Sequence, residues 1–165
     1  MRRCFASLII LMLSGCGLHP LYEGGSSGPV AAMMRSVQVA PIEGQAGWLV
    51  RNKLIDRLGE SGPGTAEYRL EVTLDDNITS FGLRTDQVAT RERRALRARF
   101  QLVQVSNGMV VLDATAGSDA GIDIVSSEYA TVAAEQTALE NLSGIVADQI
   151  VARLALYASR RDQSR

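Results

Sequence analysis

The sequence has two cysteines, one histidine and eight aromatic residues (three Phe, four Tyr, one Trp) in a length of 165 residues. Histidine is the usual general base of nucleophilic triads and a frequent zinc ligand, so one histidine, His19, is a poor basis for either kind of site. The sequence also has no Walker phosphate loop and no G-x-G-x-x-G run after a strand. We therefore expect a protein that is not an enzyme and that needs no metal and no cofactor.

Lysine is scarce as well. Lys53 is the single lysine, so arginine supplies almost all of the positive charge. Without residues 1–15, which hold two arginines and no acid, 15 basic residues stand against 18 acidic ones and the charge is −3. A general nucleic-acid binder carries a basic excess, so nucleic acid is not an expected partner. The planar guanidinium of arginine suits carboxylates and phosphates.

The N-terminus has the pattern of a bacterial lipoprotein signal. Arg2 and Arg3 precede an apolar core of nine residues, which ends at Leu13 and is followed by Ser14-Gly15-Cys16. This core is too short to cross a bilayer, which takes about 20 residues. The run before Cys16 resembles a lipobox, which predicts cleavage before Cys16 and lipid attachment to it, as a palmitate-type acylated anchor. The alternative is an ordinary signal peptide with a buried cysteine nearby.

The predicted processing divides the chain into three parts. Residues 1–15 are the signal peptide, residues 16–35 are a lipidated flexible tether, and residues 36–165 are one α+β domain. Glycine, serine and proline at 24–29 favour the tether. Once Cys4 is removed and Cys16 is acylated, no free thiol remains for a disulfide or a cysteine-based metal site.

The periodicity of apolar residues predicts the elements of this domain. Residues 68–78 alternate between apolar and polar, as in a half-buried strand, and residues 44–59 have helical spacing with Gly59 as the C-cap. Residues 117–125 have little periodicity and predict irregular structure or a frayed continuation of the preceding strand. The other predicted elements are a strand over 36–42, a strand over 88–105 after a turn over 83–87, and a helix from Ser126 or Ser127 to about Ser159 with a stripe of Val132, Leu139, Leu142, Val146, Ile150, Leu154 and Tyr157.

An Asn-Gly dipeptide indicates a tight hairpin after the strand over 88–105. A two-residue loop would put Leu102 opposite Asp113, which makes a poor core face. A three-residue loop, which pairs Val105 with Met109, puts Leu102 opposite Leu112. Because a slip of one residue turns every side chain to the other face, we predict the three-residue loop, with a left-handed glycine and a bulge.

The fold class that follows is an α+β two-layer sandwich, with two helices packed on one face of a four-stranded, mostly antiparallel sheet. Each element has one apolar face or stripe to bury, and this arrangement buries all of them together. We find no internal repeat.

A row of arginines projects from one face of the strand over 88–105: Arg91, Arg93, Arg97 and Arg99. Arg97 and Arg99 have acids, Glu71 and Asp75, on the neighbouring strand, so ion pairs across the sheet are their simplest interpretation. Arg91 and Arg93 lie nearer the hairpin tip, with Arg84 in the turn, and have fewer acidic neighbours in the predicted register. Arg84, Arg91 and Arg93 are therefore the candidate anion-binding residues.

The whole pattern resembles the LptE family of lipopolysaccharide-assembly lipoproteins, in its alphaproteobacterial form. The segments that carry the resemblance are residues 15–22 at the lipidated end, Ala89-Thr90-Arg91, Phe100-Gln101-Leu102-Val103, Tyr129-Ala130 with Ala134-Glu135 and Ala138, and residues 150–157. The resemblance implies two helices on a four-stranded sheet and a role as the plug of the LptD β-barrel in the outer membrane, anchored at its periplasmic face. It also implies binding of lipopolysaccharide, whose phosphates would meet Arg84, Arg91 and Arg93.

Two other functions stay open. The chain could be an anchored periplasmic lipid-binding or transporter-accessory lipoprotein, which would need an apolar pocket between helices and sheet. A cell-envelope enzyme would have to work through carboxylates such as Asp119 and Asp123, for which solvent-facing acids are the simpler interpretation.

Overall fold

The computed structural model describes residues 28–59, 66–83, 89–125 and 127–163. The elements in chain order are α2 (Pro29–Arg35), β1 (Val37–Val39), α3 (Gly44–Leu58), β2 (Tyr68–Leu83), β3 (Ala89–Gln104), β4 (Val110–Asp123) and α4 (Glu128–Gln163). The four strands form one sheet in the order β1-β2-β3-β4, in which β1 pairs parallel to β2 and the other pairs are antiparallel. The predicted α+β fold class is confirmed, with a third helix, α2, added.

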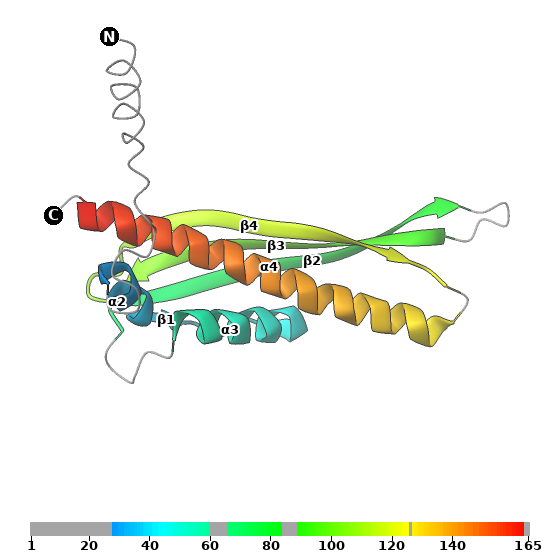
Figure 1. Ribbon diagram of the computed structural model, residues 1–165, viewed down its shortest axis with the longest axis horizontal. Helices are drawn as coiled ribbons and strands as arrows, with labels where there is room; N and C mark the ends of the chain where they lie inside the picture. Colours follow the sequence, from blue (N-terminus) through cyan, green and yellow to red (C-terminus); the bar gives the residue numbers. More distant parts are fainter. Residues whose placement is uncertain (1–27, 60–65, 84–88, 126, 164–165) are drawn as a thin grey trace, which may run out of the picture.

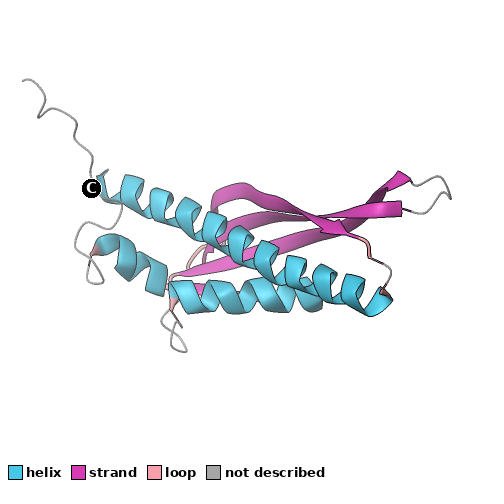
Figure 2. Cartoon of the chain, turned by 45° about the vertical axis from the view of Figure 1, so that its right-hand side comes forward, coloured by secondary structure: helices cyan, strands magenta, loops and turns pink. Residues whose placement is uncertain are grey.

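The helices cover one face of the sheet, and the other face carries no helix (Figure 2). The molecule is elongated: α2 and the end of α4 lie at one end, and the far ends of β2 and β3 lie at the other (Figure 1). β3 has 16 residues, so at about 3.3 Å per residue this strand alone runs roughly 50 Å.

The core lies between the sheet and the two long helices. From β3, Leu96, Phe100 and Leu102 point into it, and each is 0% exposed. From α4, the buried members of the predicted stripe are Leu139, Leu142, Val146, Ile150 and Leu154. This alternation on β3 and helical spacing on α4 explain why both elements form where the sequence predicted them.

α3 and α4 run side by side in the same direction. Gln45 at the start of α3 donates to Gln136 of α4, and Arg57 near the end of α3 pairs with Asp148. α4 therefore begins about two turns before α3 does, since it starts at Glu128. Those first turns have no α3 beside them, so the prediction that Val132 belongs to the buried stripe is wrong: Val132 is 57% exposed.

Helix boundaries agree well with the predictions. α3 ends before Gly59, whose φ of 84° and N–H bond to the Ile55 carbonyl make it the C-cap. At the start of α4 the Ser127 hydroxyl accepts a hydrogen bond from Ala130 N–H at 3.4 Å, as an N-cap does. α4 continues to Gln163, beyond the predicted end near Ser159.

α2 falls in the stretch that composition assigned to the tether. Residues 29–35 are helical, and Val30 and Met34 are buried. Pro29 occupies the first turn, where a missing N–H costs nothing. The tether prediction is therefore wrong for residues 29–35, because these apolar side chains pack against α4. Residues 16–27 and the signal peptide lie outside the described residues.

The β3–β4 hairpin has the predicted strand register. Phe100 lies opposite Ala114 and Leu102 lies opposite Leu112. Gly108 has the predicted left-handed conformation, with φ 71°. A register shift directly after Leu102 supplies a bulge. Burial of the Leu102 face thus selects the register, as expected.

The loop of this hairpin differs from the prediction. Val105 does not pair with Met109, because its N–H donates to the Glu67 carbonyl at 3.0 Å. The loop closes instead at Gln104, which accepts a bond from Gly108 N–H at 2.9 Å and donates to the Met109 carbonyl at 2.8 Å. Four residues, 105–108, therefore form the loop, and the bulge restores the core register.

The strands near the far end are longer than predicted. β2 continues to Leu83 and stays paired with β3. The predicted turn over 83–87 begins inside β2, and the rest of it lies outside the described residues. β4 is a continuous strand to Asp123, paired with Arg91, so irregular structure over 117–125 is wrong for residues 117–123.

β4 is a long edge strand, and α4 covers part of its edge. Gln149 of α4 receives a hydrogen bond from Gly117 N–H at 2.9 Å and donates to the Gly117 carbonyl at 3.3 Å. One side chain thus satisfies both outward backbone groups of Gly117, as a neighbouring strand would.

Candidate ligand- and partner-binding face

The candidate site is the helix-free face of the sheet. Along β3, even-numbered side chains such as Leu96 and Ala98 enter the core, while Arg97 and Arg99 lie on the opposite face. The same alternation puts Arg91 and Arg93 on this open face, as the sequence predicted.

Acids of β4 hold all four arginines. We call this set of contacts the arginine–aspartate ladder, and its pairs are Arg91–Asp123, Arg93–Asp119, Arg97–Asp119 and Arg99–Asp113. The prediction that Arg97 and Arg99 pair with Glu71 and Asp75 on β2 is wrong, and Glu71 pairs with Arg69 on its own strand.

Gly117 explains why Arg97 turns toward β4. It lies opposite Arg97 in the register, and a Cβ built on it would be 2.6 Å from Arg97 Cδ. The arginine stem can therefore lie across the bare glycine backbone. From there Nη1 reaches the Ser118 carbonyl at 2.9 Å, and Nη2 lies 2.9 Å from both carboxylate oxygens of Asp119.

Asp119 is shared between two arginines. Besides Arg97, Arg93 donates to Asp119 Oδ1 through Nε at 3.1 Å and through Nη2 at 2.8 Å. Hydrogen bonds from Arg97 and then Arg93 lower the pKa of Asp119. One carboxylate therefore serves two guanidinium groups, which leaves a net positive charge at this point of the ladder.

Asp113 is the second carboxylate of the ladder that accepts several hydrogen bonds. It accepts from Arg99 Nε at 3.2 Å, from Arg99 Nη2 at 2.8 Å and from Gln101 Nε2 at 2.8 Å. The hydrogen bonds from Arg99 and from Gln101 lower the pKa of Asp113 from 3.8 to about 2. The bonded form is thus the carboxylate at any neutral pH.

Arg91 and Arg93 have acidic neighbours after all. Arg91 donates to Asp123 through Nε at 2.8 Å, and this bond raises the pKa of Arg91. The reason for singling out these two arginines, fewer acidic neighbours, is therefore wrong, because the sequence did not predict that β4 reaches Asp123. Arg84 lies outside the described residues.

The surroundings of Arg91 and Arg93 still differ from the rest of the ladder. Phe81, 47% exposed, lies on β2 opposite Arg91. Phe81 lines two open hollows: one of about 440 Å³ is also lined by Arg93, and one of about 210 Å³ is also lined by Arg91 and by the acids Glu92 and Asp123. An exposed aromatic ring in the same hollow as Arg93, with Asn77, Thr79 and Ala95 as the other lining residues, suits a ligand that is both apolar and anionic.

Arg94 is a residue that the sequence reasoning missed. It points to the helix side, where Nε and Nη2 donate to the two Asp76 carboxylate oxygens at 2.8 and 2.6 Å, and Nη1 donates to the Glu135 carbonyl at 2.9 Å. It therefore ties β3, β2 and the first part of α4 together. The sequence could have predicted this, because Arg94 is two residues from Leu96 and therefore lies on the same face of the strand.

No helix in the described ranges is long and apolar enough to cross a membrane. Among the same residues, no group of three or more His, Cys, Asp and Glu side chains could hold a metal ion.

Several solved structures share this fold. A protein from Caulobacter crescentus CB15, described as a lipoprotein, is 26% identical over 79% of this chain and 96% of its own, with a TM-score of 0.64. Rare lipoprotein B from Shewanella oneidensis is 9% identical over 78% of this chain and 98% of its own, with a TM-score of 0.57. A minor lipoprotein from Acinetobacter baumannii is 10% identical over 74% of this chain and 92% of its own, with a TM-score of 0.54. The last two show the fold alone.

A search of curated proteins finds no match. The family model LptE, described as lipopolysaccharide-assembly, matches residues 34–154, which include every strand and most of α4. LptE is a family of non-enzymatic, envelope-associated lipoproteins. With a match over most of its length and a fold shared with other lipoproteins, this chain belongs to the LptE family of lipopolysaccharide-assembly lipoproteins.

Proposed function

We propose that this protein is an outer-membrane lipoprotein, anchored through acylated Cys16 at the periplasmic face, which assembles with the LptD β-barrel as its plug. It takes part there in delivering lipopolysaccharide to the cell surface. It acts by binding and by shape, and it catalyses no reaction. The family match and the fold support this role.

The observation that carries the proposal is the arginine–aspartate ladder on an uncovered sheet face. A sheet face that binds a second apolar layer is itself apolar, whereas this one exposes charged side chains along β3 and β4. The lumen wall of an outer-membrane barrel is polar. Such a wall can accept the ladder without desolvating unpaired charges.

The dimensions support the same role. β3 runs roughly 50 Å by its residue count, and a bilayer with its headgroups is about 40–45 Å thick. A domain of this length, aligned with a barrel axis, reaches from one membrane surface to the other. α2, which follows the anchor segment, lies at the end opposite the far ends of β2 and β3 (Figure 1), and the pairing of Phe81 with Arg91 belongs to those far ends.

Co-purification tests the barrel partner. The tagged protein is extracted from membranes in mild detergent, and we expect a large β-barrel protein in stoichiometric amount. Mass spectrometry of the same sample should show Cys16 as an acylated N-terminal residue. A protein that elutes alone, or a free Cys16 thiol, contradicts the proposal.

Lipopolysaccharide binding tests the hairpin arginines. Reversal of charge in Arg91→Glu with Arg93→Glu should weaken binding, and the weakening should shrink at high salt, because it arises from lost phosphate attraction. The matched control is Arg99→Glu, which reverses a charge of the same ladder away from Phe81. Equal affinity in all three proteins would show that Arg91 and Arg93 are ordinary surface charges.

The alternative, an anchored periplasmic lipid-binding or transporter-accessory lipoprotein, needs an apolar pocket between helices and sheet. Leu96, Phe100 and Leu102 occupy the middle of that space, each 0% exposed. The hollow of about 730 Å³ that reaches α4 is open and is lined by Asp75, Arg97, Arg99 and Arg153 as well as by Leu74, Ala98 and Ala116, so it is not an apolar pocket. A native mass spectrum with one bound lipid per chain and no barrel partner would favour this alternative.

A further inference from the structure

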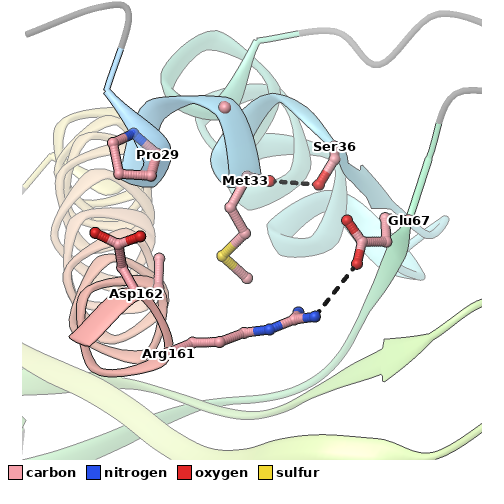
Figure 3. Close-up of a pocket in the computed structure, with 8 residues that line it drawn as sticks. Pro29, Met33, Ser36, Glu67, Arg161 and Asp162 are labelled. Atoms are coloured by element: carbon pink, nitrogen blue, oxygen red, sulfur yellow. Dashed lines mark hydrogen bonds and ion pairs between the residues drawn. The ribbon is translucent and has the colours of Figure 1, made fainter. Parts of the chain in front are cut away.

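A hollow of about 280 Å³ lies at the α2 end of the molecule, between α2 and the last turns of α4 (Figure 3). Its lining residues are Pro29, Ala32, Met33 and Ser36 from α2 and the residue after it, Glu67 before β2, and Ala158, Arg161 and Asp162 from α4. The volume lies just below the roughly 300–1,000 Å³ of small-molecule sites, so it suits a few side chains better than a whole lipid.

The polar rim of the hollow is held by contacts within the domain. Arg161 Nη2 lies 3.6 Å from Glu67 Oε1, and the Arg161 guanidinium carbon lies 5.6 Å from the centre of the Tyr68 ring. Tyr68 donates its hydroxyl to the same Glu67 oxygen at 3.1 Å, and the Ser36 hydroxyl donates to the Met33 carbonyl at 2.7 Å. What the hollow offers an occupant is therefore the apolar wall of Met33 and its neighbours, beside an edge where Arg161 lies with the acids Glu67 and Asp162.

The sequence just before the hollow contains a matching segment. Leu18, Leu21 and Tyr22 are followed by six mostly polar residues, 23–28, and then by Pro29 in the wall of the hollow. Six residues span at most about 20 Å, which is enough for the chain to fold back on itself and keeps the segment close to the hollow. Pro20 restricts the backbone of the segment and so reduces the entropy lost on docking.

We propose that residues 18–22 dock in the hollow between α2 and α4. Leu21 and Tyr22 pack against Met33 and Ala158. The docked segment holds Cys16 close to the α2 end of the domain. The free linker that carries the lipid anchor is then residues 16–17 and not residues 16–27. The inference concerns the domain itself and does not depend on LptD.

The short connection makes even a weak contact effective. A segment tethered by six residues samples the hollow at an effective concentration in the millimolar range. A contact with a dissociation constant below that value is occupied for most of the time.

Cysteine cross-linking tests this in the full-length, membrane-bound lipoprotein. The pair Leu21→Cys with Ala32→Cys joins the segment to an exposed position in the hollow wall, and the control pair Leu21→Cys with Ala152→Cys joins it to an exposed position on α4 outside the hollow. A disulfide needs Cβ atoms about 3.5–4.5 Å apart. Mass spectrometry counts the remaining free thiols after mild oxidation.

We expect the hollow pair to close at least ten times faster than the control pair. Adding Leu18→Ser and Tyr22→Ser should bring the rate down to the control value, because the remaining segment has lost its apolar contacts. Equal rates in the two pairs overturn the proposal. A fast cross-link that disappears when Cys16→Ser removes the acyl chains, in a protein that also carries Cys4→Ser so that no further thiol is present, would also overturn it, since those chains would then be the occupant.

Discussion

Arg94 allows a quantitative test of how burial decides the strength of an ion pair. Its side chain is 12% exposed and that of Asp76 is 24% exposed, whereas Arg99 in the ladder is 68% exposed. Both arginines make two hydrogen bonds to one aspartate, so geometry is nearly matched. The two pairs differ in their exposure to solvent and in the extra hydrogen bond that Arg94 donates to the Glu135 carbonyl.

Arg94→Met keeps the apolar stem and removes the charge. Loss of one partner from a fully buried pair costs about 3–5 kcal/mol, and loss from an exposed pair about 0–1 kcal/mol. With 12% and 24% exposure the Arg94–Asp76 pair lies between these limits, so we expect a loss of about 2 kcal/mol. At a urea dependence of about 2 kcal/mol per molar, the unfolding midpoint falls by about 1 M.

Arg99→Met is the matched control and should leave the urea midpoint almost unchanged. Addition of Asp76→Asn to Arg94→Met should cost little more than Arg94→Met alone, because the two residues act as one unit. If Arg94→Met and Arg99→Met shift the midpoint equally, burial does not decide the strength of these pairs and the reasoning is refuted.

Three further predictions concern single positions. Gly47→Ala should destabilise the fold by about 1–3 kcal/mol in urea unfolding, because a Cβ there would lie 2.6 Å from the Ile42 carbonyl oxygen. Gly144→Ala in α4 is the control: a Cβ there would meet nothing within 4 Å, so this variant should stabilise the fold by about 0.5–1 kcal/mol. A change of the same sign in both variants would contradict this account of the packing. Asp113 has its pKa lowered to about 2 in the fold, so its contribution is present above about pH 4 and is lost as the pH falls toward 2. Asp113→Asn should flatten the dependence of the unfolding free energy on pH between 4 and 2, and an unchanged slope would assign it to other carboxylates. Gly117→Ala should push Arg97 away from Asp119, so the pKa of Asp119 should rise toward 3.8 in a carboxyl NMR titration; an unmoved pKa would mean that Arg97 reaches Asp119 by another path.

Where apolar residues recur at a regular spacing, the sequence was enough to predict the structure. The helix over 44–59 and its glycine cap agree with α3 within a residue. The register of β3 and β4 followed from Leu102 alone, because only one pairing buries it against Leu112. The bounds of α3 and the register of β3 and β4 depend on which side chains are buried, and the apolar or polar character of each residue predicts its burial.

Where residues are small or polar, partners elsewhere in the chain decide the structure. Residues 117–123 contain glycine, serine and aspartate and have no periodicity, yet they form a strand because β3 pairs with them. α2 forms in a stretch whose composition indicates a tether, because α4 buries Val30 and Met34. Neither partner is visible in the local sequence.

That the arginines lie on one face of β3 follows from the order of residues alone, because side chains alternate along any strand. Their pairing with acids of β4 and not of β2 depends on how the folded strands lie beside one another. A guanidinium on a flexible stem can reach either neighbouring strand, and the bare backbone of Gly117 opens one of the two paths. The same holds for Val132: its helical spacing placed it on the apolar stripe, but α4 begins two turns before α3, so no side chain of α3 is there to cover it.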